Sequence, residues 1–194
     1  MQLWNNKFSN NDLEALHTFE KKVKAGKGNS VEVYFTDIST ARSIFKDIIS
    51  KQQAKNIIAD SSGLTRSFLE ESLLDESLNI YFDGDKYTAN AADIGVSEME
   101  FAIAESGSLV ELSDSIWKRL VSAMPSLHIA LVCADRIAKD FETAFEILKK
   151  HILDVAQISF ITGPSITADI ERVLTIGVHG PSKLVVFFIK ENKQ

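Results

Sequence analysis

Cysteine is nearly absent from this chain, and its scarcity excludes several classes of redox protein. Cys133 is the only cysteine among 194 residues. One thiol cannot form an internal disulfide, and it cannot supply the four thiolates of an iron–sulfur cluster or a zinc site. Because Cys133 follows an apolar run, we expect a small buried residue rather than a reactive thiol. Any redox centre must then belong to a partner, and we expect this chain alone to bind no cofactor and no metal.

Long apolar runs and a surplus of basic residues are missing as well. The longest apolar stretches, such as residues 184–189, are much shorter than the ~20 residues that cross a bilayer. The net charge of -6 gives no basic footprint for nucleic acid or for an anionic membrane. The first residues lack the basic and apolar segments of a secretory leader. These features predict a cytoplasmic protein with no membrane span and no nucleic-acid partner.

Proline and glycine are scarce too, with 3 and 9 residues respectively. The sequence contains no linker rich in either residue and no repeat at a fixed period. A length of 194 residues suits a single hydrophobic core, and 45% hydrophobic residues are typical of a globular domain. We therefore expect one domain over residues 1–194, with a helix in 1–28, an α/β core in 29–190 and a polar tail in 191–194.

Strand and helix patterns alternate along the first half of the chain. A helical pattern capped by Asn10 or Asn11 precedes three β-rich segments, which are separated by further helical patterns. Such alternation is typical of a parallel sheet with helices on its faces. The strands are expected at 31–35, 57–60 and 78–82, and the helices at 41–49 and 64–74.

The second half of the chain adds an antiparallel element. Residues 100–105 and 108–111 are predicted to form a hairpin that turns at Ser106–Gly107, because glycine tolerates the positive φ of a tight turn. The expected fold class is α/β, with a mostly parallel sheet flanked by helices and an antiparallel hairpin. Further strands are expected at 127–133, 158–161 and 184–189, and further helices at 116–123, 141–152 and 168–174.

Polar residues that are unusual for their surroundings fall in four segments at strand ends or turns. In open α/β sheets, ligands bind beyond the carboxyl ends of the strands, so the four segments are candidates for one site. The first segment places Glu105 at the hairpin beside Ser106, Gly107 and Ser108. Glu105 could act there as a nucleophile, a general base or a hydrogen-bond acceptor, although a solvated turn carboxylate is the simpler interpretation.

Two histidines stand in the second and fourth segments. His128 lies in an apolar strand, where a neutral histidine held by one or two hydrogen bonds is more common than a ligand or base. His179 lies beside Gly180, and the glycine permits close approach of a ligand or another chain. By contrast, His17 and His151 fall on predicted amphipathic helices, where we expect surface or packing residues.

The third segment, residues 162–171, is predicted to form a strand end, a sharp turn and a helix start. Unpaired N–H groups at such a turn, with the hydroxyls of Ser165 and Thr167, can bind a phosphate or carboxylate. Ordinary helix capping explains the same residues, and Asp169 and Glu171 would oppose a nearby anion. The residues expected to contact a ligand here are Gly163, Pro164, Ser165, Thr167, Asp169 and Glu171.

The order and content of these segments resemble the LUD-domain family. Residues 1–94 agree with that family mainly in their layout of a helix followed by strand and helix. Family members often carry a basic residue inside the Gly-Pro-Ser motif where this chain has Ile166, so the case for anion binding there is weaker. The residues that carry the resemblance are Gly-Val-Ser-Glu-Met-Glu-Phe-Ala-Ile-Ala-Glu-Ser-Gly-Ser-Leu-Val at 95–110, Pro-Ser-Leu-His-Ile at 125–129, Gly-Pro-Ser-Ile-Thr-Ala-Asp-Ile-Glu at 163–171 and Gly-Val-His-Gly-Pro at 177–181.

This resemblance implies a fold like that of ribose-5-phosphate isomerases and CoA transferases. It also implies a role in oxidising L-lactate to pyruvate, beside subunits that are iron–sulfur proteins. Glu105, His128 and His179 are then the candidate catalytic residues, and we expect them to share one pocket for a small carboxylate. The expected ligand contacts outside the third segment are Ser106, Gly107 and Gly180.

Two other functions stay open at this stage. The chain could be an enzyme in its own right, a transferase, isomerase or ligase that acts on a phosphorylated or CoA-linked metabolite. It could instead be a regulatory module that senses a metabolite and catalyses nothing. The sequence also leaves open whether the chain forms a homo-oligomer.

Overall fold

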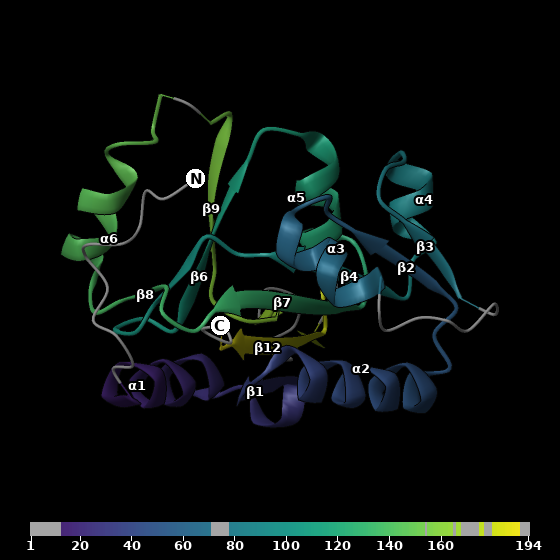
Figure 1. The fold of residues 1–194 in the computed structure, drawn as a ribbon, viewed down its shortest axis with the longest axis horizontal. Coiled ribbons are helices and arrows are strands. Elements are labelled where there is room, and N and C mark those ends of the chain that lie inside the picture. The colour runs from purple at the N-terminus through teal and green to yellow at the C-terminus, as the bar shows by residue number, and fades with distance from the viewer. Residues whose placement is uncertain are drawn as a thin grey trace.

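The computed structural model describes residues 13–70, 78–153, 155–164, 166–167, 175–176 and 180–190. These residues form a six-stranded sheet, a four-stranded sheet and a two-stranded ribbon (Figure 1). The six-stranded sheet has the strand order β1-β12-β7-β4-β2-β3, and each of its pairings is parallel. Its strands are β1 (Val31–Thr36), β2 (Asn56–Ala59), β3 (Asn79–Tyr81), β4 (Ile94–Glu98), β7 (Leu127–Cys133) and β12 (Lys183–Ile189).

Strand β7 lies at the centre of the parallel sheet because its sequence is apolar on both faces. All seven of its residues are buried. Leu127, Ile129 and Leu131 face a core that is shared with α2 (Ile38–Gln52) and α3 (Gly63–Glu70). Ala130 and Val132 face the opposite core, which includes residues of helix α1 (Leu13–Lys24). The sheet is therefore covered on both sides, as parallel sheets usually are.

The flanking helices form where the apolar spacing and the caps agree. Helix α2 buries Ala41, Phe45 and Ile49, which recur every four residues along one face. Its N-cap is Asp37, which accepts a hydrogen bond from the Thr40 N–H, and the bonds to this carboxylate hold its pKa well below the ordinary value. The predicted first helix is confirmed as α1, while its predicted asparagine cap lies outside the described residues.

The four-stranded sheet has the order β8-β5-β6-β9 and contains the predicted hairpin. Strands β5 and β6 are antiparallel, with Ile103 opposite Ser108, so four residues form the turn rather than two. Gly107 has φ +67°, as a left-handed turn position requires, and packs against the backbone of Lys22 and Val23. The strands are β5 (Phe101–Ile103), β6 (Ser108–Ser113), β8 (Ile137–Ala138) and β9 (Gln157–Ile161).

The hairpin belongs to this second sheet and not to the parallel sheet. Phe101, Ile103 and Val110 form their own core cluster with helix α6 (Phe141–Leu148). Because α6 covers this face of the hairpin, β5 and β6 form a separate layer. The expected α/β class, with a mostly parallel sheet, helices and an antiparallel hairpin, is confirmed.

Helix α6 is shorter than its sequence pattern predicted. It ends at Leu148 instead of continuing to residue 152, and the chain then turns with a hydrogen bond from the His151 N–H to the Leu148 oxygen. Phe145 of this helix has 56% of its surface exposed. The remaining described elements are the 3₁₀ turn η1 (Gly28–Ser30), α4 (Lys86–Asn90), α5 (Ile116–Ala123), β10 (Ile166–Thr167) and β11 (Thr175–Ile176). The helix predicted at 168–174 lies outside the described residues.

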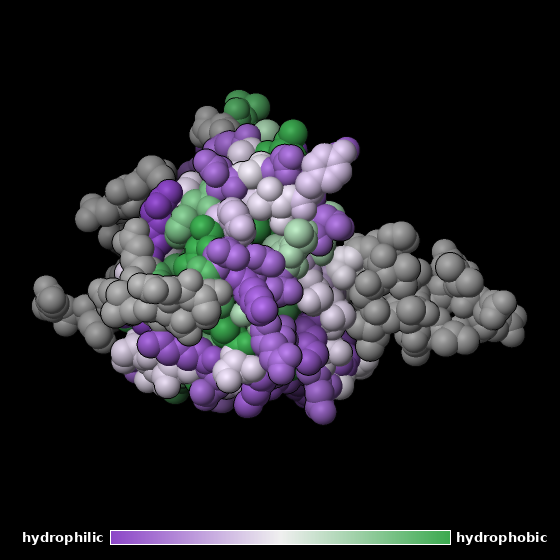
Figure 2. All heavy atoms as spheres, turned by 90° about the vertical axis from the view of Figure 1, so that its right-hand side faces the viewer, coloured by the Kyte–Doolittle hydropathy of each residue, from purple (hydrophilic) through white to green (hydrophobic). Residues whose placement is uncertain are grey.

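Among the described helices, none combines the length and the apolar character that a membrane span requires. Figure 2 shows the side of the molecule that is on the right in Figure 1, where β3 and α4 lie. Hydrophilic side chains are spread across that face, and hydrophobic ones appear in patches between them.

Candidate functional site

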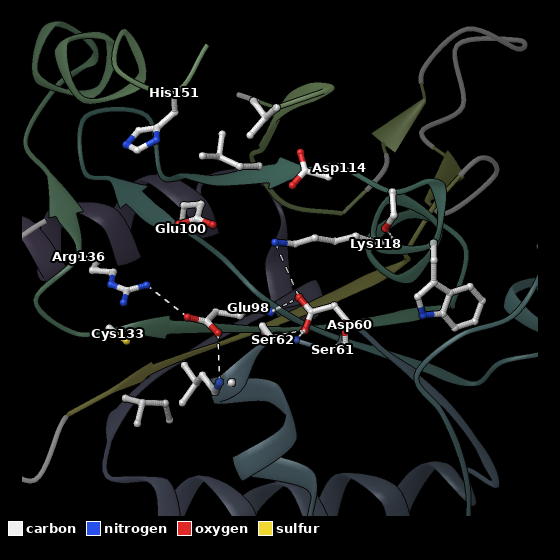
Figure 3. Close-up of a pocket in the computed structure, with 17 residues that line it drawn as sticks. Asp60, Ser61, Ser62, Glu98, Glu100, Asp114, Lys118, Cys133, Arg136 and His151 are labelled. Atoms are coloured by element: carbon white, nitrogen blue, oxygen red, sulfur yellow. Dashed lines mark hydrogen bonds and ion pairs between the residues drawn. The ribbon is translucent and has the colours of Figure 1, made fainter. Parts of the chain in front are cut away.

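A cavity of about 960 Å³ lies at the carboxyl edge of the parallel sheet (Figure 3). Residues that follow β2, β4 and β7, together with the last residue of β12, line it from the sheet. The end of β6, the start of α5 and the segment after α6 line the rest. We call this cavity the carboxyl-edge pocket. Its polar lining consists of Asp60, Ser61, Ser62, Glu98, Glu100, Asp114, Ser115, Lys118, Arg136 and His151.

Two carboxylates of this pocket are held by backbone N–H groups. Asp60 accepts hydrogen bonds from the Glu98 N–H at 3.0 Å, and from the Ser62 N–H and hydroxyl at 3.2 and 2.7 Å. Glu98 accepts from the Leu64 N–H at 3.2 Å, in the first turn of α3. These bonds tie the loop after β2 to the end of β4. Both carboxylates are therefore fixed in position before any ligand arrives.

Two cations lie beside these fixed carboxylates. The Arg136 guanidinium contacts Glu98 at 3.3 Å, and the Lys118 ammonium lies 3.9 Å from Asp60. An arginine has five N–H donors and a lysine three, so most donors of both side chains are not used by these contacts. In Figure 3, both charged groups extend from the wall of the pocket toward Glu98 and Asp60. The pocket can thus offer hydrogen-bond donors to an anionic group.

Glu100 and Asp114 differ from the two fixed carboxylates. Within the described part of the chain, neither side chain has a hydrogen bond or an ion pair. Both lie above Asp60 and Glu98 in the view of Figure 3. Their oxygens are available to accept a hydrogen bond from a ligand. Four carboxylates against two cations also make the pocket acidic, so a bulky polyanion would be repelled.

A fifth carboxyl group, Glu111, lies in the protein interior near this pocket. It is fully buried on β6, and neither of its oxygens has a hydrogen-bond partner among the described residues. Burial raises the pKa of Glu111, while the nearby Ser122, Lys118 and Arg119 only partly oppose that shift. The Ser113 hydroxyl, two residues along the same strand, is also buried, and no described residue forms a hydrogen bond with it. Burial thus favours the neutral form of this carboxyl.

His128 lies at the opposite edge of the parallel sheet from this pocket. It is the second residue of β7, paired with Gly95 and Leu184 near the starts of their strands. The ring is 1% exposed, and its Nε2 lies 2.8 Å from the Ser97 hydroxyl. Its Nδ1 has no hydrogen-bond partner in the part of the chain that the structure describes. Burial lowers the pKa of His128 to about 4. The enclosed, neutral histidine matches the simpler of the two predicted roles.

Glu105 is exposed at the turn between β5 and β6. Its carboxylate accepts a hydrogen bond from the Phe141 N–H at 3.1 Å, at the first residue of α6. Glu105 and His128 therefore have different surroundings, and neither lines the carboxyl-edge pocket. The structure does not bring these two predicted catalytic residues together.

The four predicted segments instead meet as two pairs. The Ser108 hydroxyl lies 2.8 Å from the Thr162 hydroxyl, which joins the first segment to the third. The Ser182 N–H donates to the Ser126 oxygen at 2.9 Å, so the chain after Gly180 lies beside the second segment. Of the predicted ligand contacts, Ser106, Gly107, Gly163 and Pro164 lie near the first junction, and Gly180 near the second. Ser165, Asp169, Glu171 and His179 lie outside the described residues, as does the side chain of Thr167.

The sequence predicted a site beyond the carboxyl ends of the strands, and the carboxyl-edge pocket lies there with other residues in its lining. Asp60 and Glu98 stand at the ends of β2 and β4, the position expected for a ligand site in an open α/β sheet. The signal that could have found Asp60 is a carboxylate that directly follows the apolar run of residues 57–59. His151, interpreted as a surface or packing residue, also lines the pocket. In the part of the chain that the structure describes, no three His, Cys, Asp or Glu residues are arranged to hold a metal ion.

Comparison with known proteins gives a consistent family. The family described as LUD domain matches residues 16–189. The Lactate utilization protein C of Bacillus licheniformis is 38% identical over 107 residues, which are 53% of this chain and 45% of that protein. The protein of the same name from Geobacillus sp. is 31% identical over 162 residues, 75% of this chain and 67% of that protein. The chain spans about half the length of several curated relatives that it matches.

A solved structure has a similar fold. A DUF162 family protein from Deinococcus radiodurans superposes with a TM-score of 0.68 and covers 91% of this chain and 97% of its own. The two sequences are 19% identical, so this likeness concerns the fold alone.

Proposed function

Because the chain belongs to the LUD domain family, we propose that it serves lactate utilisation by binding a small 2-hydroxy acid in the carboxyl-edge pocket. Relatives named Lactate utilization protein C support the first part of this proposal. The lining of the pocket supports the second part. Oxidation of L-lactate to pyruvate releases two electrons, which the proposal assigns to iron–sulfur protein partners because this chain has one cysteine.

The observation that carries the proposal is the mixed lining of the pocket. Arg136 and Lys118 have unused donors for a carboxylate, while Glu100 and Asp114 have free oxygens for a hydroxyl group. A 2-hydroxy acid has both of these groups on adjacent carbons. The fixed carboxylates of Asp60 and Glu98 keep the two cations in place, so little ordering is required on binding.

The volume of the pocket favours a second candidate function. About 960 Å³ is near the upper end of pockets that hold drug-sized ligands, and a three-carbon acid fills only a small part of it. The extra room suits either an electron acceptor beside the acid, or a larger phosphorylated or CoA-linked metabolite as the substrate of a transferase, isomerase or ligase. The acidic lining disfavours a phosphorylated or CoA-linked metabolite, because its phosphates would lie close to Glu100 and Asp114.

Calorimetric titration of the purified chain with L-lactate, pyruvate and acetate tests the proposal. We expect L-lactate to bind more tightly than acetate, and Arg136→Met to weaken binding of L-lactate at least tenfold. Arg66→Met is the matched control, because Arg66 lies over the Phe82 ring and does not line the pocket. This control should bind L-lactate within twofold of the unmodified chain.

The same two variants also test the physiological role. In cells whose own gene is deleted, the R66M chain should restore growth on L-lactate and the R136M chain should not. Equal rescue by both variants, together with no binding of L-lactate or pyruvate, would contradict the proposal. Binding of a phosphorylated or CoA-linked metabolite in their place would support the second candidate.

A further inference from the structure

Lys27 has a charge that no acidic side chain in the described residues balances. Its ammonium group donates one hydrogen bond, to the backbone oxygen of Thr162. No carboxylate of the described chain lies within ion-pair distance of it. Lys27 is half-buried, and this burial lowers its pKa. Since an ammonium has three N–H donors, two of them have no acceptor among the described residues.

A glycine allows Lys27 to reach the backbone at this place. Gly163 has φ +114°, and a Cβ atom added there would lie 2.6 Å from the Lys27 ammonium nitrogen. A larger residue would push the ammonium group away from the chain. The turn at Gly163 therefore contacts a basic side chain. That side chain is Lys27, which follows α1, and not a residue inside the Gly-Pro-Ser motif.

Next to this turn, the hydroxyl groups of Ser106, Ser108 and Thr162 are connected by hydrogen bonds. The Ser106 hydroxyl donates to Ser108 at 2.8 Å, and the Ser108 and Thr162 hydroxyls are 2.8 Å apart. The three hydroxyls have three protons between them, and these two hydrogen bonds use only two. One hydroxyl proton is left without an acceptor in this part of the structure. Lys27, Ser106, Ser108, Thr162 and Gly163 together form what we call the hairpin–turn junction.

We propose that the hairpin–turn junction binds a small oxyanion, a carboxylate or phosphate group, through Lys27 and Thr162. The junction has a surplus of hydrogen-bond donors and a positive charge, and a bound oxyanion supplies the missing acceptors and countercharge. Thr162 is exposed, so the site is open to solvent. None of the five residues lines the carboxyl-edge pocket, so this site is separate from the proposed site for the 2-hydroxy acid.

An anion bound at this junction would also connect three parts of the fold. Lys27 follows α1, Ser106 and Ser108 belong to the hairpin, and Thr162 follows β9. The hairpin already contacts α1 through Gly107, which packs on the backbone of Val23. Binding should therefore stabilise the folded chain as well as occupy the junction.

Site-resolved NMR of the full chain can separate the two sites. The Gly163 amide reports on the hairpin–turn junction, and the Gly63 amide on the carboxyl-edge pocket. During titration with inorganic phosphate or acetate at constant ionic strength, we expect the Gly163 signal to shift and saturate below about 10 mM. A response to phosphate alone, or to acetate alone, assigns the ligand group. No saturable shift with either anion overturns the proposal.

Variants then distinguish an anion-binding site from a contact in which Lys27 only stabilises the turn. Lys27→Met should weaken binding at least tenfold, whereas Lys24→Met should change it less than twofold, because Lys24 is already paired with Glu20 at 2.6 Å. Thr162→Val keeps the backbone oxygen that Lys27 contacts and should still weaken binding severalfold. Arg136→Met should leave the Gly163 response unchanged. Unaltered affinity in both K27M and T162V would show that Lys27 only clamps the turn.

Discussion

The two edges of the parallel sheet contrast in how they treat polar side chains. At the carboxyl edge, Asp60 and Glu98 lie beside cations around an open cavity. Near the amino edge, the ring of His128 is enclosed in the core, where it reaches the buried Ser97 hydroxyl of β4. The first arrangement places charged groups around a cavity, where a ligand can reach them. The second keeps its histidine neutral, so its hydrogen bond serves the packing of the core.

The reason for this contrast is the position of helix α5. Its backbone at Val121 packs directly on Gly95 of β4, which is the neighbour of His128 in the sheet. At the carboxyl edge, the start of α5 instead holds Trp117 and Lys118 at the wall of the cavity. One helix thus closes one end of the sheet and borders the pocket at the other end.

Replacing one glycine at each edge should give the largest difference in stability between the two edges. In Gly95→Ala, the new Cβ would collide with the backbone oxygen of Val121, which a small side-chain movement cannot relieve. We expect a loss of about 3 kcal/mol or more in the free energy of unfolding. In Gly63→Ala, at the carboxyl edge, no described atom lies within 4 Å of the new Cβ, and the change should stay within about 0.5 kcal/mol. Urea unfolding of both variants measures the contrast, and equal losses would contradict it.

Acid should lower the free energy of unfolding through His128, near the amino edge. The pKa of His128 is about 4 in the folded chain against an ordinary value of 6.5, so the unfolded chain takes up this proton first. The stability that the neutral ring contributes is complete above pH 6.5 and is lost as the pH falls toward 4. This loss amounts to about 3 kcal/mol for one histidine. Unfolding free energies measured across that window should fall less steeply in His128→Gln, and an unchanged slope would count against an enclosed neutral ring.

Glu111, beside the carboxyl edge, should have a smaller effect on the pH dependence of stability than His128, and in the opposite direction. Burial raises its pKa, so the folded chain retains a proton that the unfolded chain has already lost. Stability therefore falls as the pH rises from the ordinary value of 4.5 through the raised folded pKa. We expect Glu111→Gln to be more stable than the unmodified chain at pH 8, with the gain shrinking toward pH 4.5. Thermal unfolding at several pH values measures it, and a gain that does not vary with pH would refute this explanation.

Much of the fold could be predicted because its elements have strong local patterns. The strand at 127–133 and the helix at 116–123 occur with the predicted bounds as β7 and α5. Strand β4 was not predicted because Gly95, Ser97 and Glu98 interrupt its apolar pattern, and only pairing with β2 and β7 makes it a strand. Strand β8 has two residues, too few for any periodicity.

The candidate site was harder to predict than the fold. The sequence indicated polar residues at strand ends but could not separate strand starts from strand ends within the assembled sheet. His128 follows Pro125 and Ser126 and lies at the start of β7. The pocket is lined by Cys133, at the opposite end of the same strand. Arg136 and Lys118 had no signal at all, because exposed basic residues are common on any surface.

The sequence by itself determined the α/β class, the hairpin, the apolar strand around His128 and the resemblance to the LUD-domain family. These follow from the spacing of apolar residues and from short motifs, which act over a few residues. Only the tertiary structure decided that the hairpin forms its own sheet, that Asp60 meets Glu98, and that Lys27 reaches Gly163. The last two contacts join residues that are 38 and 136 positions apart in the chain. They depend on which strands pair and which helix covers them, and no local pattern encodes that choice.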